Sequence, residues 1–442
     1  MKLAAIAALG ALLGMIGSAP GAAGATPDRF PVTAATSVAG LRVLSQADGD
    51  APLTGVAIFV SAGLERQTQA TNGAAAMTAE CVLRTPVALA GAPAPLPLRD
   101  AIAAAGGSLT YAVDDSTVHY YVESRPERMP ELLGLVGKAL AAPDFSAVVV
   151  ADARKHLQQR VADAEKNPLR VGVQMVKESF LEAGLAYPDY GTAASLAVLG
   201  PSALRDFYAH TYVRGGVSVS IVGRVTPDVT AAAGSLAQGL PAGTMSALTT
   251  KARAIPAGGT RIIAQRDMGR PFIVVGFGAP APGERDFGSM LIVESLLSEA
   301  FERSSATTLA LGERSVGALY LFDSTPASLI VYVNGGTGVD PSVALREVML
   351  VAKSLAAKPL GADALKKFKE SAAGSFVTNA TSLSDRAYLV GALGSTGLGD
   401  QSVNGALDAI DRATSADVQR AAKTYLQKYI VALVVPRQSQ SN

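Results

Sequence analysis

The sequence has 442 residues and a balanced charge, with 38 Lys and Arg against 37 Asp and Glu. Hydrophobic residues make up 49% of the chain, so it is too apolar to be disordered and long enough for two or three cores. The formal net charge of +1 gives no support for nucleic-acid binding, which is typical of chains with a basic excess. The single cysteine, Cys81, excludes an intrachain disulfide and a multi-cysteine zinc module.

The N-terminal segment has the pattern of a secretory signal peptide. Lys2 precedes an apolar run from Leu3 to about Gly17, and small residues follow as far as the A-x-A sequence at 23–25. Pro20 interrupts the run too early for a stable membrane helix, although an N-terminal anchor is the alternative. We therefore expect a signal peptide at 1–25 and a periplasmic or secreted mature chain.

Two stretches of the chain show a strand followed by a helix. Residues 117–123 alternate in polarity as a half-buried strand does, and residues 328–334 form a second strand of the same length. Each strand is followed by a proline and then by a helical run, at 132–140 in the first case and at 343–355 in the second. The same order in both places suggests a repeated unit.

Matched residues of the two units are separated by nearly equal distances in sequence, which supports this repeat. Val122 matches Val333 at a distance of 211 residues, and Tyr212 matches Tyr425 at a distance of 213 residues. Recurrence of helix–strand units by chance is the alternative. Strands and long helices occur in runs rather than in strict alternation, which favours an α+β fold over a parallel α/β fold. We therefore expect two homologous domains, each with an antiparallel-rich sheet and helices packed on it.

A segment rich in Pro, Gly, Ala, Ser and Thr separates the two repeats. It covers residues 239–259 and has the composition of an exposed linker. The sequence therefore predicts an N-terminal domain at 30–238 and a C-terminal domain at 260–437.

Short motifs follow one another in a fixed order along the chain. They are VSAG at 60–63, GAAAMTAECVLRT at 73–85, AAGGSL at 104–109, DD at 114–115, APDF at 142–145, NP at 167–168 and AYPDYG at 186–191. This series resembles the pitrilysin/insulinase-type (inverzincin) metallopeptidases, in which a strand and loop lead into a helix with the zinc motif H-x-x-E-H. The resemblance spans nearly the whole chain after residue 25 and follows the order of that family's paired domains.

The zinc motif itself is absent. In H-x-x-E-H the two histidines lie on one helix face and hold Zn²⁺, while the Glu activates its bound water. One register places these three positions on Ala76, Ala79 and Glu80, and a shift by one residue places them on Met77, Glu80 and Cys81. Neither register contains a histidine. We therefore expect no metal ligand and no catalytic residue in this chain, so it is not catalytic alone.

Other zinc donors are few. The family's third ligand is a Glu on a later helix, and the nearest position here is Arg160, whose charge would repel Zn²⁺. Glu80 and Cys81 are adjacent on a helix and point too far apart to chelate one ion, and Cys81 is interpreted as a small buried hydrophobic residue. The three histidines have simpler interpretations. His119 is interpreted as a solvated or partner-facing strand residue, His156 as a solvent-facing helix residue, and His210 as a helix cap.

A second feature of the family concerns substrate binding. In its C-terminal domains, an Arg and a Tyr near a G-x-x-Y motif reach an active site formed with the facing domain. The resemblance implies that Arg314 and Tyr320 bind substrate here. Their spacing is six residues where the family usually has seven, and Glu313 takes the expected Arg position. The alternative is a surface Arg and a Tyr that packs at the start of a strand.

These patterns lead to one main functional hypothesis and two alternatives. We expect the non-catalytic subunit of a periplasmic zinc-peptidase heterodimer, which binds and encloses peptide for a homologous sister subunit. Zinc is expected only in that partner. The alternatives are a pure scaffold subunit of a larger complex and an autonomous hydrolase with an unrecognised site.

Overall fold

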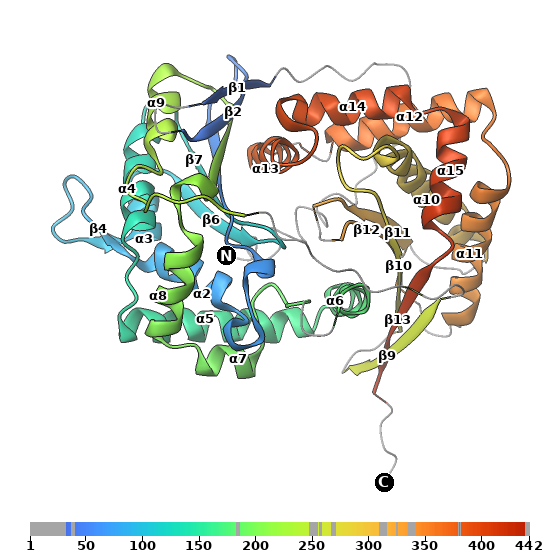
Figure 1. Cartoon of the computed structure of the whole chain (residues 1–442), viewed down its shortest axis with the longest axis horizontal. Helices are drawn as coiled ribbons and strands as arrows, with labels where there is room; N and C mark the ends of the chain where they lie inside the picture. The colour runs from blue at the N-terminus through green and yellow to red at the C-terminus, as the bar shows by residue number, and fades with distance from the viewer. Residues whose placement is uncertain are drawn as a thin grey trace, which may run out of the picture.

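The fold contains two large β-sheets, one in each half of the chain (Figure 1). The computed structural model describes residues 32–36, 40–182, 186–246, 255, 259–266, 271–308, 316–323, 326–334, 341–378, 380 and 382–437. In spatial order, the first sheet consists of β1 (Thr33–Thr36), β2 (Arg42–Ala47), β8 (Val217–Gly223), β3 (Thr54–Val60), β7 (Val118–Ser124) and β6 (Ser108–Val113). The second consists of β11 (Val316–Leu321), β12 (Ser328–Asn334), β10 (Phe272–Gly278), β13 (Tyr429–Pro436) and β9 (Thr260–Arg266).

The two sheets have the same topology. Read from β6, the first sheet runs β6-β7-β3-β8-β2, and the second runs β11-β12-β10-β13-β9 from its matching edge. The pairs β2–β8 and β9–β13 are parallel, and the other pairs of these two sheets are antiparallel. Val122 lies in β7 and Val333 in the equivalent β12. The predicted fold class, two homologous antiparallel-rich units, is therefore confirmed.

Helices cover both sheets, and a short hairpin of β4 (Pro86–Val87) and β5 (Leu96–Pro97) extends from the first. The helices of the first half are η2 (Leu64–Arg66), η3 (Gln69–Thr71), α2 (Ala74–Arg84), α3 (Leu98–Ala104), α4 (Met129–Ala141), α5 (Ala147–Glu165), α6 (Pro168–Phe180), α7 (Ala193–Val198), α8 (Pro201–Thr211), η4 (Arg214–Gly216) and α9 (Pro227–Ser235). Those of the second half are α10 (Phe287–Thr308), α11 (Pro341–Ala357), α12 (Ala362–Thr378), α13 (Leu383–Gly394), η5 (Gly399–Gln401), α14 (Ser402–Arg412) and α15 (Ser415–Tyr425). None of the helices in the described ranges has the length and apolar character needed to cross a membrane.

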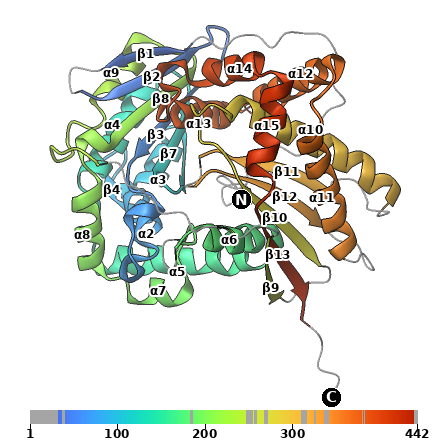
Figure 2. The same ribbon diagram turned by 45° about the vertical axis from the view of Figure 1, so that its right-hand side comes forward.

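One helix of each half packs on the sheet of the other half, an arrangement that we call the helix exchange. Helix α6 belongs to the first half but packs on β10 and β13, while α13 belongs to the second half and packs on β3 and β8 (Figures 1 and 2). Val176 of α6 shares a core cluster with Val274, and Val390 of α13 shares one with Phe59. The two halves therefore follow one another in sequence, but the packing crosses the boundary between them.

The Asn-Pro motif explains where α6 begins. The side chain of Asn167 accepts hydrogen bonds from the backbone N–H groups of Leu169 and Arg170, at 3.1 and 3.2 Å. Pro168 occupies the first turn, where its missing N–H costs nothing and its fixed φ favours the helix. This strong start separates α6 from α5 and lets α6 cross to the second sheet.

Glycines allow the exchanged helices to approach the sheets closely. A Cβ atom on Gly172 of α6 would overlap with Val274, and one on Gly276 of β10 would overlap with Val176. On the other side of the molecule, a Cβ atom on Gly391 of α13 would overlap with the ring of Phe59. Small residues at both crossings therefore make the exchange sterically possible.

Candidate functional site

Helix α2 occupies the place in the first half where the resemblance would put the zinc motif. Its residues from Ala74 to Leu83 are all buried. The helix begins after Gly73, whose φ of 93° lies in the left-handed region. Gln67 supplies the missing cap, because its Oε1 accepts from the N–H groups of Gly73 and Ala75, both at 3.0 Å.

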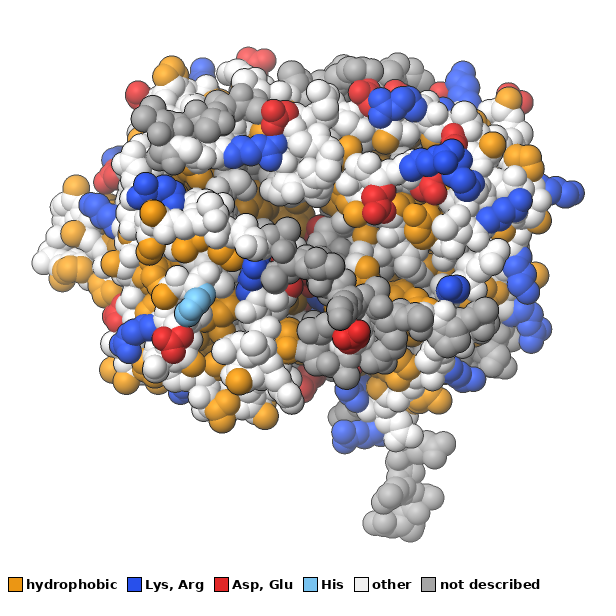
Figure 3. Space-filling view, viewed as in Figure 1, with side chains coloured by type: hydrophobic (Ala, Val, Ile, Leu, Met, Phe, Trp, Pro, Cys, Tyr) orange, Lys and Arg blue, Asp and Glu red, His pale blue; other side chains and the backbone are white. Residues whose placement is uncertain are grey.

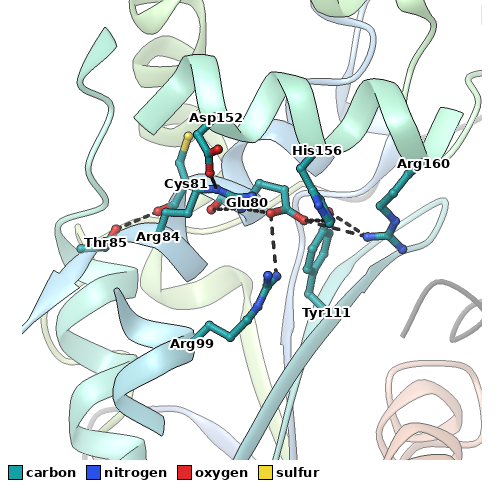
Figure 4. A network of polar contacts seen from close by, with 9 residues as sticks. All are labelled: Glu80, Cys81, Arg84, Thr85, Arg99, Tyr111, Asp152, His156 and Arg160. Atoms are coloured by element: carbon teal, nitrogen blue, oxygen red, sulfur yellow. Dashed lines mark hydrogen bonds and ion pairs between the residues drawn. The ribbon is translucent and has the colours of Figure 1, made fainter. Parts of the chain in front are cut away.

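Glu80 is the charged residue at the centre of this position. It is 0% exposed and lies between α2, α3 and α5 (Figure 4). Arg84, one turn later on α2, forms an ion pair with its Oε2, and Arg99 of α3 lies 3.8 Å from the same oxygen. Arg160 of α5 lies 4.0 Å from Oε1. Three guanidinium groups therefore surround one buried carboxylate.

His156 completes the Glu80 cluster, which we define as Glu80, Arg84, Arg99, His156 and Arg160. Its Nε2 lies 3.4 Å from Glu80 Oε1. Burial, followed by repulsion from the three arginines, lowers the pKa of His156 to about 4, so the ring is neutral at neutral pH. The side chain of His156 is 41% exposed, as expected of a solvent-facing residue, but the packing of α5 on α2 also turns its ring toward Glu80.

This donor set does not fit zinc. It offers one carboxylate and one imidazole, whereas three guanidinium groups lie within 4.0 Å of that carboxylate and would repel a divalent cation. Throughout the described ranges, no three His, Cys, Asp or Glu side chains come together as a metal site. Arg160 also donates to Tyr111 at 3.2 Å and to Tyr190 at 2.5 Å, so hydrogen bonds fix its guanidinium next to Glu80.

Cys81 takes no part in the Glu80 cluster. Its side chain is buried and its sulfur is a free thiol. Burial raises the pKa of the thiol to about 12, which leaves essentially no thiolate for nucleophilic chemistry at neutral pH. The interpretation of Cys81 as a small buried hydrophobic residue is confirmed.

A cavity of about 380 Å³ lies between the halves, beside α6. Its walls come from α6, the C-terminal end of α5, the turn between β6 and β7, the segment 188–192 and the β11–β12 region. Two ion pairs border the cavity. Lys177 pairs with Asp115, and Arg170 pairs with Asp189 at 2.5 Å. The space-filling view shows the surface recessed between the halves, with hydrophobic side chains along the recess (Figure 3).

The acidic pair after β6 leads to a second polar network, which the sequence did not reveal. His119 Nδ1 lies 3.0 Å from Asp114 Oδ2, and the ring of His119 lies 4.7 Å from the ring of Tyr388 on α13. The side chain of His119 is only 9% exposed. The interpretation of His119 as solvated or partner-facing was therefore wrong, because α13 from the second half covers that face of β7.

The predicted substrate-binding pair is only partly visible. Arg314 lies outside the described residues. Tyr320 lies in β11, is 3% exposed and donates its hydroxyl to the carbonyl of Pro280. A substrate would have to displace that hydrogen bond to reach the hydroxyl, so the role of Tyr320 stays a prediction. His210 has the cap-like position that was predicted, with its Nδ1 2.6 Å from the carbonyl of Asp206 near the end of α8.

The arginines around Glu80 lead to a prediction about the zinc content of the protein. We expect the purified mature chain to carry no stoichiometric zinc after dialysis and to leave unfolded peptides intact, because the guanidinium groups around Glu80 would repel a divalent cation. Elemental mass spectrometry and a peptide-cleavage assay measure the two quantities. One zinc per chain that disappears on replacing Glu80 and Cys81 with Ala would contradict this expectation.

Comparison with solved structures identifies chains of the same fold. The peptidase M16 inactive domain from Pseudomonas fluorescens has 15% sequence identity and a TM-score of 0.78, over 93% of this chain and 99% of that chain. A protease from Helicobacter pylori has 14% identity and a TM-score of 0.78, over 92% of this chain and 100% of that chain. A chain of complex III2 from Candida albicans, with Inz-5 bound, has 13% identity and a TM-score of 0.73, over 92% of this chain and 96% of that chain.

No protein-family model matches the sequence, and no curated protein matches it. At 13–15% identity, the likeness concerns the fold and not the activity. The chain therefore has the fold of the M16 peptidases, the pitrilysin-type fold that its motifs predicted, without the H-x-x-E-H motif.

Proposed function

We propose that this chain is the non-catalytic subunit of a periplasmic zinc-peptidase heterodimer. The observation that carries this proposal is the Glu80 cluster, in which arginines surround a buried carboxylate on α2 within an M16-type fold. In this proposal the chain keeps the frame of a peptidase and leaves the metal-dependent chemistry to its partner. A homologous sister subunit with H-x-x-E-H would supply the zinc.

The geometry of β6 supports a role in peptide binding. In the described part of the first sheet, β6 is an edge strand whose other side is not paired with a strand. Its last residue, Val113, and the following Asp114 and Asp115 line the cavity between the halves. An extended peptide can add to such an edge through backbone hydrogen bonds, while side-chain pockets supply specificity. In this proposal Arg314 and Tyr320 remain the candidates for further substrate contacts.

A scaffold role is the second candidate, and the complex III2 chain with the same fold favours it. Peptide binding separates the two proposals, because a pure scaffold has no need of an open substrate cavity. A neighbouring gene that encodes a chain of similar length with H-x-x-E-H would favour the peptidase proposal and would supply the partner for reconstitution.

A cavity-filling variant tests peptide binding. Val171 of α6 lines the cavity, so Val171→Trp should fill part of it and weaken binding of fluorescein-labelled unfolded casein peptides at least tenfold, or about 1.4 kcal/mol. Val148→Trp is the matched control, because Val148 is 79% exposed at the opposite end of α5 from the cavity. Fluorescence anisotropy measures both affinities.

Hydrogen exchange locates the bound peptide. Binding at the edge of β6 should slow amide exchange in residues 108–113, since new backbone hydrogen bonds protect these groups. No peptide binding by the wild-type chain, or equal affinities of the two Trp variants, would leave only the scaffold role.

A further inference from the structure

Three side chains connect the halves beside the cavity. Asp114 follows β6 in the first half, whereas Asp323 follows β11 and Tyr388 lies on α13, both in the second half. The hydroxyl of Tyr388 lies within hydrogen-bond distance of Asp323 Oδ2 and 3.3 Å from Asp114 Oδ2. This Asp114–Tyr388–Asp323 triad therefore spans the boundary between the two halves.

When both carboxyl groups of the triad are ionised, one hydroxyl proton has to serve two carboxylates. Tyr388 carries one hydroxyl proton, which can serve only one of the two carboxylates at a time. If Asp323 is protonated, it donates to the Tyr388 oxygen, and the hydroxyl is then free to donate to Asp114. One additional proton therefore completes a chain of two hydrogen bonds across the boundary, while its absence leaves two carboxylates facing one donor.

The surroundings of Asp323 favour that additional proton. Burial, followed by repulsion from Asp114, raises the pKa of Asp323 to about 6. The basic side chains nearby already have partners, because Lys177 of α6 pairs with Asp115, and His119 of β7 contacts Asp114. The groups that act on Asp323 are Asp114, Asp115 and Tyr388. The other charged or titratable groups contact these residues or line the same cavity: His119, Lys177, Arg170, Asp189, Glu165, Glu178 and Arg266.

We propose that the triad is a proton-dependent latch between the two halves. With the additional proton, it ties the segment after β11 and helix α13 to the turn between β6 and β7. Loss of that proton weakens this contact next to the cavity. The latch does not depend on the proposed peptidase role, since it concerns only the contact between the halves.

The sign of the pH effect follows from linkage. The folded chain holds the proton on Asp323 up to a higher pH than the unfolded chain, in which an Asp titrates near pH 4. The contribution of this group to stability is therefore complete at low pH and is lost as the pH rises from about 4 to about 6. The difference of about two pKa units corresponds to about a hundredfold change in the folding equilibrium.

The variant Asp323→Asn tests the latch, because its amide is neutral at every pH and can donate to Tyr388 as the protonated acid does. Its folding equilibrium constant should exceed that of the wild type by a few fold at about pH 4 and by about a hundredfold at about pH 7.5. Amide protection factors in α13, corrected for intrinsic exchange rates, should rise in the variant at the higher pH only. Urea titration and hydrogen exchange measure the two effects.

Asp400→Asn is the control for other contacts between the halves. Asp400 pairs with Arg42 at 2.6 Å across the boundary, but its side chain is 67% exposed. This variant should keep the wild-type pH dependence. An Asp323→Asn chain that also keeps the wild-type pH dependence of α13 protection would overturn the proposal.

A spectroscopic measurement covers the case in which Asp323→Asn fails to fold. Infrared difference spectra of the wild-type chain, with isotope-labelled aspartate carboxyls, should show a protonated aspartate that titrates near pH 6 in the folded state. Tyr388→Phe should shift this titration, since it removes the group that joins the two carboxylates. Absence of such an aspartate would equally overturn the latch.

Discussion

Replacing Glu80 with Gln should lower the free energy of unfolding by about 3–5 kcal/mol, as measured by urea or guanidinium denaturation. The substitution keeps the shape of the side chain but removes the only buried carboxylate of the Glu80 cluster. Arg84 and Arg160 have side chains that are only 15% and 11% exposed, so solvent compensates their charges poorly. The neighbouring guanidinium groups would then repel one another in a region of low dielectric.

Asp152→Asn provides the control for this prediction. Asp152 pairs with the same Arg84 at 2.6 Å, but its side chain is 66% exposed. Exposed ion pairs contribute at most about 1 kcal/mol, so this variant should be close to the wild type in stability. Equal losses of stability in the two variants would show that burial of Glu80 is not what makes it important. A stable Glu80→Gln chain would mean that the arginines rearrange toward solvent.

The variant Gly391→Ala should destabilise the chain by about 1–3 kcal/mol. The position lies in α13, where Ala would normally favour a helix over Gly by up to about 1 kcal/mol. The added methyl group would overlap with the ring of Phe59 in β3, which is itself buried. The helix would have to move away from the first sheet, and the exchange of helices between the halves would weaken. Thermal or chemical denaturation measures the change.

Gly374→Ala is the matched control for the exchange. Gly374 lies in α12, and a Cβ atom there would have no neighbour within 4 Å. The helix propensity of Ala then acts alone and should stabilise the chain by up to about 1 kcal/mol. Stabilisation by both substitutions would contradict the close contact between α13 and β3.

The sequence was sufficient for the fold class and for the main helices and strands, because these depend on patterns that each segment carries. Strand and helix periodicity placed β7, β12, α4 and α11 within a few residues of their observed bounds, and the spacing of Val122 and Val333 predicted the repeated unit. The absence of histidine in α2 likewise needed no structure. Chelation at i and i+4 is a local geometric requirement, and no register of this helix meets it.

Only the tertiary structure showed which residues surround Glu80. Arg99 and His156 come from α3 and α5, and no local pattern brings them to Glu80 of α2. The exchange of α6 and α13 was equally invisible, because an amphipathic pattern shows which face of a helix is buried but not which sheet covers it. The burial of His119 and the latch around Tyr388 follow from that exchange. Local periodicity therefore determined the elements, whereas contacts between distant segments decided the chemistry of the site.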